Sequence, residues 1–280
     1  MTTRQRLLKG LVLAVAGLGL FLVCIYIFLP SERINSTINQ VLAGQGLLLS
    51  PAGHKTLLPG LAWDNLQLSS EQGALVRCER LKVRLLLLPL LTGRATLKGA
   101  ASIGAGQLKA DIGLTGKQAL DLQAQGINLA DIPFFKTVLG ARMGGSLRSE
   151  GLVKRGPKGL NGELKLEVRQ LEFSGVKLGA FPLPDVSKLS SQGMVRVTNN
   201  RIRLESFTLQ GDGIYMRLSG DIPSGANAIN LPLNLSLEIM PKPDFLEKQK
   251  LVFLLLAKFM VSPGVYQVPV KGTLLNPLIL

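Results

Sequence analysis

Alternating apolar and polar residues dominate the chain from about residue 57 onward. Successive residues of a β-strand point to opposite faces, so alternation of this kind predicts strands with one apolar face and one wet face. Turn signals containing glycine, asparagine and proline separate the runs. The pattern predicts a mainly β fold built on an antiparallel sheet with one covered face. The clearest alternating runs are residues 164–168, 202–204, 214–218 and 231–239.

These runs supply ten candidates for one concave apolar surface. An apolar sheet face has to be buried, because leaving each Leu or Val in water forfeits about 1.5–3 kcal/mol. Few helical segments are available as cover, so we expect the antiparallel sheet to curl on itself into a groove. Two outcomes stay open: a groove that accepts acyl chains, or a two-layer sandwich with a filled core. The candidates are Leu164, Leu166, Ile202, Leu204, Ile214, Met216, Leu218, Leu233, Leu235 and Leu237.

Short helices are expected at a few places. Residues 31–43 carry one apolar face and are followed by Gly44, which ends a helix readily. Residues 244–261 open with Asp244 and are rich in Leu and Phe, but their apolar run is too short to span a bilayer. This helix either plugs one end of the sheet or lies on a membrane surface with the help of its lysines. Residues 126–140 predict a further short helix or a loop.

The N-terminal segment predicts a membrane anchor. The run from Gly10 through Leu20 to Leu29 contains no charge and, as a transmembrane helix, spans the ~30 Å core of a bilayer. Basic residues precede it, and the residues just after it carry no net charge. The positive-inside rule therefore places residues 1–9 in the cytoplasm and residues 30–280 across the membrane. A cleaved signal peptide is the alternative, but the run is longer than usual and lacks a small-residue cleavage site.

The chain is strongly basic, with a formal net charge of +14 at pH 7. Part of this charge lies on the predicted wet strand faces, for example at Arg196 and Arg203. A basic surface favours anionic partners such as lipid headgroups or lipopolysaccharide, with plain solubility as the alternative. Nucleic acid is not expected as a partner, because the basic domain lies outside the cytoplasm.

The residues offer little catalytic chemistry. The sequence has no phosphate-binding loop, dinucleotide-binding glycine motif or serine nucleophile elbow. His54 is the only histidine. Cys24 lies in the predicted anchor and Cys78 far beyond it, so no internal disulfide is expected. The acidic residues mostly flank predicted turns, and we therefore expect no enzyme, no catalytic or metal site and no cofactor.

Two short motifs add a family resemblance. Residues 88–94, Leu-Pro-Leu-Leu-Thr-Gly-Arg, lie between two predicted strands and resemble the L-x-P-L-L-x-G corner of the AsmA and TamB superfamily of envelope proteins. Residues 272–277, Gly-Thr-Leu-Leu-Asn-Pro, resemble the closing strand of that superfamily. With an N-terminal anchor and only 280 residues, the chain is similar to the type II secretion system protein N (GspN) family in its shorter form. The resemblance implies a periplasmic β-sheet, rolled into a groove and fixed to the inner membrane, and it supplies no catalytic residues.

Two functions follow as hypotheses. The first is an accessory component of the type II protein secretion pathway, which acts by contact with other secretion-system proteins. The second is a lipid-binding or lipid-transfer protein that holds acyl chains in an apolar β-groove. Both place the chain in the inner membrane as a single-pass protein, with its N-terminus in the cytoplasm and its bulk in the periplasm. An enzyme is a third hypothesis, and it requires a cleft that gathers two or more acidic residues.

Overall fold

The computed structural model describes residues 30–90, 92–179, 181–225 and 228–279, together with Gly17, Tyr26 and Phe28. Among these residues, no helix is long and apolar enough to cross a bilayer. The expected transmembrane helix falls almost entirely outside the described residues, which exclude its Gly10, Leu20 and Leu29.

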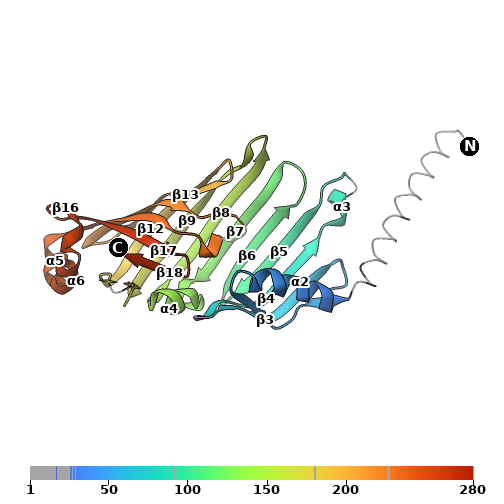
Figure 1. The fold of residues 1–280 in the computed structure, drawn as a ribbon, viewed down its shortest axis with the longest axis horizontal. Coiled ribbons are helices and arrows are strands. Elements are labelled where there is room, and N and C mark those ends of the chain that lie inside the picture. Colours follow the sequence, from blue (N-terminus) through green and yellow to red (C-terminus); the bar gives the residue numbers. More distant parts are fainter. Residues whose placement is uncertain are drawn as a thin grey trace, which may run out of the picture.

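The alternating runs form a 16-stranded antiparallel sheet in which most strands pair with their neighbours in sequence (Figure 1). Its strands are β1 (Leu47–Ser50), β2 (His54–Lys55), β3 (Gly60–Ser70), β4 (Gly73–Leu85), β5 (Thr96–Ile103), β6 (Gly106–Gly113), β7 (Gln118–Asn128), β8 (Arg142–Gly156), β9 (Gly159–Ser174), β12 (Val186–Thr198), β13 (Arg201–Gln210), β14 (Ile214–Ile222), β15 (Asn234–Pro241), β16 (Met260–Ser262), β17 (Val265–Thr273) and β18 (Asn276–Ile279). A separate two-stranded hairpin joins β10 (Lys177–Leu178) to β11 (Phe181–Pro182). The prediction of a mainly β fold with a large antiparallel sheet is confirmed.

The helical segments are short and lie outside the sheet. They are α2 (Ser31–Ala43), α3 (Leu87–Leu90), η1 (Leu129–Asp131), α4 (Phe134–Leu139), η2 (Ala228–Asn230), α5 (Pro243–Lys248), α6 (Lys250–Leu255) and η3 (Ala257–Phe259). α2 covers the range in which the sequence pattern predicts a helix. The single helix predicted over residues 244–261 is wrong in detail, because this segment is divided into α5, α6 and η3.

The division of that segment has a tertiary cause at Gln249. This residue leaves the helical conformation, with φ −120° and ψ 34°. Its side-chain amide donates to the Asp185 carbonyl at 2.7 Å, and its side-chain oxygen accepts from the Asp185 N–H at 2.9 Å. These two bonds fasten the helical segment to the loop before β12, a contact that local periodicity does not reveal.

The strand register places apolar residues opposite one another across the sheet. In the middle of the molecule, Leu164 of β9 lies opposite Gly151 of β8 on one side and Val195 of β12 on the other. Val195 in turn lies opposite Leu204 of β13. Paired residues of neighbouring strands point to the same face. One side of the sheet is therefore apolar along nearly its whole width, and we call it the apolar face.

β-Bulges preserve this arrangement where the register shifts. Between β8 and β9 the pairing shifts by one residue around Gly145, which has φ 125°. Met143 pairs with Phe173 on one side of the bulge, and Leu147 pairs with Val168 on the other. A one-residue slip without a bulge would move every side chain beyond it to the opposite face. The bulge instead keeps both pairs in the apolar core.

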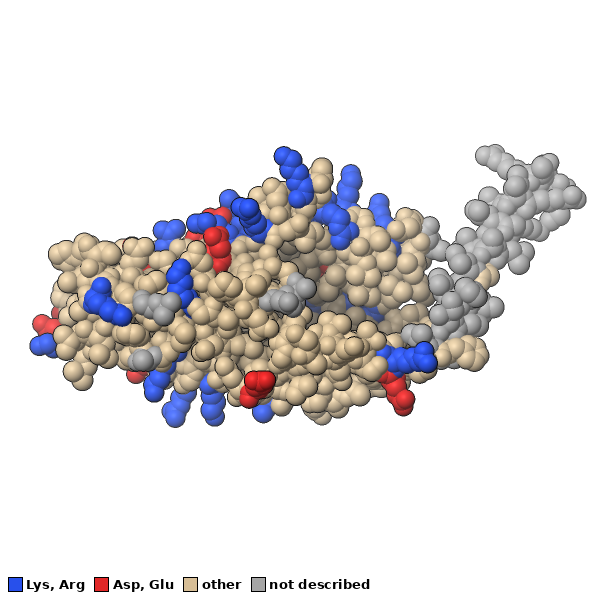
Figure 2. Space-filling model, in the orientation of Figure 1, with Lys and Arg blue, Asp and Glu red and all other residues tan. Residues whose placement is uncertain are grey.

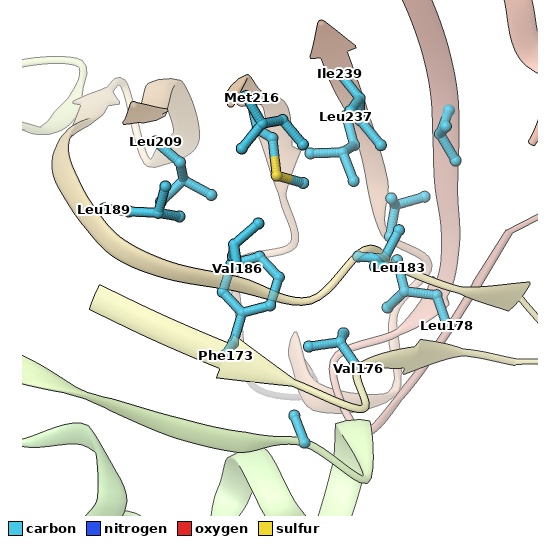
Figure 3. Packing of buried hydrophobic residues seen from close by; sticks show 14 of the residues in the cluster. Phe173, Val176, Leu178, Leu183, Val186, Leu189, Leu209, Met216, Leu237 and Ile239 are labelled. Carbon is cyan, nitrogen blue, oxygen red and sulfur yellow. The ribbon is translucent and has the colours of Figure 1, made fainter. Parts of the chain in front are cut away.

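Two clusters of buried side chains lie on the apolar face. The smaller cluster surrounds Trp63, and Ile38 of α2 packs against it. The larger cluster draws residues from β8 to β18, including Phe173, Leu189 and Met216 (Figure 3). The sheet curls far enough that β18 contacts both β10 and α4, and the C-terminal strands lie in front of the middle strands in Figure 1. Curling therefore buries part of the apolar face against the same sheet.

Cys78 belongs to the smaller cluster. It faces Leu66 across β3 and β4 and is only 7% exposed, although charged residues flank it in sequence. It forms no disulfide with any described residue. Burial, and secondarily the nearby Glu79 carboxylate, raise the pKa of the Cys78 thiol above its ordinary value.

Cys78 should therefore be protected from thiol reagents in the folded chain. At pH 8 its thiol is protonated and shielded, so alkylation by iodoacetamide should be roughly tenfold or more slower than that of an exposed cysteine. Mass spectrometry of the full-length Cys24→Ser variant measures this rate. Urea should abolish the protection, and equal rates with and without urea would contradict the packing around Cys78.

Candidate functional site

The apolar face is organised as rows that cross the strands at right angles. We define the rim row as the set nearest the 157–158 and 199–200 turns, and the base row as a set nearer α4. The rim row comprises Leu85, Leu97, Ile112, Leu120, Val153, Gly162, Val197, Ile202 and Ile222. The base row comprises Ile127, Leu147, Val168, Ser191, Leu209, Met216, Ile239 and Tyr266.

Two further rows lie between them. The second row, next to the rim, comprises Val83, Gly99, Ala110, Leu122, Gly151, Leu164, Val195, Leu204, Gly220, Leu235 and Val270. The third row comprises Leu81, Ala101, Leu108, Ala124, Ser149, Leu166, Gly193, Phe207, Leu218, Leu237 and Val268. The four rows together make one apolar surface that continues from strand to strand.

Burial changes systematically from the base row to the rim row. Most base-row side chains are closed off from solvent, with Ile239 at 0% and Met216 at 1% exposure, and Leu147 is half-buried. Most rim-row side chains are half-buried, and Ile112 is 42% exposed. The apolar face is therefore a packed core at its base and an accessible apolar surface toward its rim. One sheet therefore carries both a buried apolar core and a more exposed apolar surface.

Nine of the ten candidates from the sequence belong to strands of this face, and they divide between its two parts. Leu204, Ile214, Met216 and Leu237 are buried in the packed part, and Leu233 is buried just outside the strand. Half-buried positions are occupied by Leu164, Leu166, Ile202, Leu218 and Leu235. Leu233 precedes β15, because the strand begins at Asn234 and not at residue 231. Its N–H donates to the Gly272 carbonyl at 2.8 Å.

Sequence reasoning missed the N-terminal half of the accessible surface. Leu97, Ile112, Leu120 and Leu122 continue the rim and second rows across β5, β6 and β7. Their alternation is present in the sequence. Small residues such as Gly99 stand at intervening positions of the same face and weaken the apolar signal.

Small residues also leave the second row with little side-chain volume. Gly99, Ala110, Gly151 and Gly220 all belong to it. Figure 2 views the molecule from the side on which α2, α4 and β18 lie in Figure 1. This side is mostly uncharged, is hollowed near its middle and has Lys and Arg along its upper and lower edges.

Most charged residues of the strands lie on the opposite, polar face. Several form ion pairs there: Arg196 Nη2 is 3.5 Å from Glu163 Oε1, and Arg203 Nη1 is 3.3 Å from Asp221 Oδ1. A hydrogen bond donated by Arg169 lowers the pKa of Glu167 on the same face. The positive charge at these pairs is compensated locally.

A sizeable depression lies away from the accessible apolar rows, where β8 and β12 begin and β9 ends. It has a volume of about 750 Å³ and borders α5. Its charged lining residues are Arg142, Lys188, Lys242, Lys248, Glu172, Asp185, Asp212 and Asp244. Mixed charge of this kind does not single out an anionic or a cationic ligand. In the described part of the chain, no three His, Cys, Asp or Glu side chains are grouped to hold a metal ion.

His54, the only histidine of the sequence, belongs to the short strand β2. It pairs with Ala62 of β3. Its Nε2 is 4.0 Å from Asp64 Oδ2, and both side chains are more than half exposed. The structure therefore brings His54 near one carboxylate at the surface.

Comparison with known proteins adds no relative: no protein-family model, no curated protein and no solved structure matches the chain.

The burial gradient predicts different costs for the same truncation at the two ends of the face. Leu209→Ala in the base row should lower the free energy of unfolding by about 2–5 kcal/mol, because it opens a cavity in packed surroundings. Leu97→Ala in the rim row should cost about 1 kcal/mol, because water already reaches that side chain. Urea denaturation of the full-length variants in detergent measures both. Equal losses would contradict the division into packed and accessible parts.

Proposed function

We propose that the accessible part of the apolar face binds lipid acyl chains, in a protein attached to the bacterial inner membrane through residues 10–29. The observation that carries this proposal is that most residues of the rim row and second row are half-buried, and that both rows run without interruption by charge from β4 to β14. Apolar surface of this extent is costly to leave in water, at about 25 cal/mol per Å². A hydrocarbon ligand removes that cost without requiring any hydrogen bond.

The dimensions of the rows suit an acyl chain. The rim row crosses nine strands, β4–β9 and β12–β14. Neighbouring strands lie about 4.8 Å apart, so the row is on the order of 40 Å long. The hydrocarbon of one membrane leaflet is about 15 Å thick, half the thickness of the bilayer core. The row therefore has room for an acyl chain laid across the strands.

The same proposal places the chain with the type II secretion system protein N family, within the AsmA and TamB superfamily. The corner motif supports this placement, since its Pro89 carbonyl accepts from the N–H groups of Thr92 and Arg94 and makes a tight turn between β4 and β5. The closing motif supports it too, because residues 272–277 comprise the end of β17, a two-residue turn and the start of β18, with Gly272 paired with Pro277 and Thr273 paired with Asn276.

Photo-crosslinking in cells tests acyl-chain binding. A benzophenone side chain in place of Leu122 or Leu164 should capture phospholipid or lipopolysaccharide. Matched controls are Gln123 and Lys165, the next residues in the same strands, whose side chains lie on the polar face. Capture at the two leucine positions and not at the controls is expected. Equal capture on both faces, or capture only of other parts of the same chain, would contradict the proposal.

A second candidate function, contact with another protein of the secretion pathway, is favoured by a separate surface. We define the distal patch as Leu251, Leu254, Leu255, Met260 and Val261, which are between 51% and 77% exposed. They lie on α6 and β16, at the end of the sheet opposite α2 in Figure 1. Exposed apolar patches of this kind are typical of protein or membrane contacts.

The secretion phenotype of a charge variant tests this second function. Leu254→Asp should reduce export of a type II secretion substrate severalfold while the level of the variant stays normal. Leu152→Asp is the control, because Leu152 is an exposed leucine on the polar face. Normal export by the Leu254→Asp strain would exclude a secretion role for the distal patch.

A further inference from the structure

Three loops come together at the end of the sheet where β3 begins and β4 ends. The Leu85 N–H donates to the Pro59 carbonyl at 2.8 Å, and the Leu86 N–H donates to the Thr96 carbonyl at 2.9 Å. The Leu114 N–H donates to the Ala95 carbonyl at 2.8 Å. These backbone bonds hold the loop residues 56–59, 86–90 with 92–95, and 114–117 beside one another in the order of their strands.

Each loop presents leucine side chains to solvent. We define the leucine edge as Leu57, Leu58, Leu88 and Leu114. Leu57 is fully exposed, Leu88 is 80% exposed, and the other two are more than half exposed. Single exposed leucines are ordinary, but leucines at the tips of three adjoining loops form a patch.

Tyr26 links the leucine edge to the predicted membrane segment. Its hydroxyl lies 2.8 Å from the carbonyl oxygens of both Thr56 and Gly60, at the two ends of the loop that carries Leu57. The Lys55 ammonium donates to the Tyr26 carbonyl at 2.9 Å and lies 5.2 Å from its ring centroid. Tyr26 is three residues before Leu29, so it is about 4–5 Å inside the end of a helical span. Tyrosines at this depth are typical of the membrane interface.

The charge of the loops fits a bilayer surface as well. The segments 55–60, 84–96 and 113–118 contain no Asp or Glu. They carry Lys55, Arg84, Arg94 and Lys117. Each basic side chain near an anionic membrane surface contributes about 1 kcal/mol to attraction. Apolar tips with basic neighbours match the headgroup and acyl layers of one leaflet.

We infer that the leucine edge inserts into the outer leaflet of the membrane that holds the anchor, and so fixes the sheet against the bilayer. The lipid bilayer is the partner because Tyr26 continues directly from the leucine edge into the predicted span. This inference rests on the membrane attachment in the proposed function and does not depend on acyl-chain binding by the rim row. The leucines of the leucine edge belong neither to the packed core nor to the accessible rows, and membrane insertion gives them a role.

Fluorescence quenching in vesicles tests the leucine edge. The full-length variants Leu57→Cys, Leu88→Cys and Leu251→Cys are labelled with an NBD fluorophore and reconstituted in phosphatidylethanolamine and phosphatidylglycerol. The wild-type chain gives the background from Cys24 and Cys78. Acyl-chain nitroxide lipids should quench the labels at positions 57 and 88 by roughly half, because these probes enter the hydrocarbon. The label at position 251, an exposed leucine of the distal patch, should stay unquenched.

Three other outcomes would overturn the inference. In the first, the chain stays with the vesicles after a carbonate wash, but the labels at positions 57 and 88 are quenched no more than the label at position 251. Such a chain has an anchor but no inserted leucine edge. Quenching at 57 alone excludes a surface shared by the loops. A chain that the carbonate wash removes from the vesicles refutes membrane attachment itself, and with it this part of the proposed function.

Discussion

The need to cover one continuous apolar face governs this structure. The strand register pairs apolar residues with apolar residues from β3 to β18. The strands therefore cannot be divided into independent units that each bury a separate hydrophobic core. Helices offer limited cover, since the longest in the described part of the chain is α2 with 13 residues. The sheet therefore curls, and its curvature is the main means of removing leucine and valine side chains from water.

Curling closes the C-terminal part of the face more completely than the rest. Phe253 of α6 packs on Tyr266 of β17 with ring centroids 5.2 Å apart, and Phe245 of α5 lies 6.2 Å from Phe253. These aromatic contacts close the base of the face beside β15 and β17. Toward the rim, aliphatic and small residues predominate in the rows. Aromatic residues are therefore concentrated where the core is closed and scarce where the apolar surface remains accessible.

Much of this organisation could be predicted from the sequence, because alternation and turn signals are local properties. The runs around Leu164 and Met216 follow period two closely, and both lie on the apolar face as expected. The division at Gln249 could not be predicted, since its cause is a contact with Asp185, 64 residues away in sequence. The decrease in burial from the base row to the rim row could not be predicted from the sequence either. Leu164 and Leu204 share one row and similar local patterns, yet only Leu204 is buried, because cover depends on how far the sheet curls.

The leucine edge and the rim row adjoin one another, and this joins the two proposals into one physical arrangement. Leu85 and Leu97 pair at the start of the rim row, and the loop between them carries Leu88. Leu114 follows Ile112 of the same row by two residues. An acyl chain that leaves the bilayer beside Leu88 would meet apolar side chains at each step toward the second row. Transfer along such a path avoids exposing the hydrocarbon to water, at about 0.8 kcal/mol for each methylene. A leucine edge set in the membrane would thus place the open end of the apolar face where its proposed ligand is most concentrated.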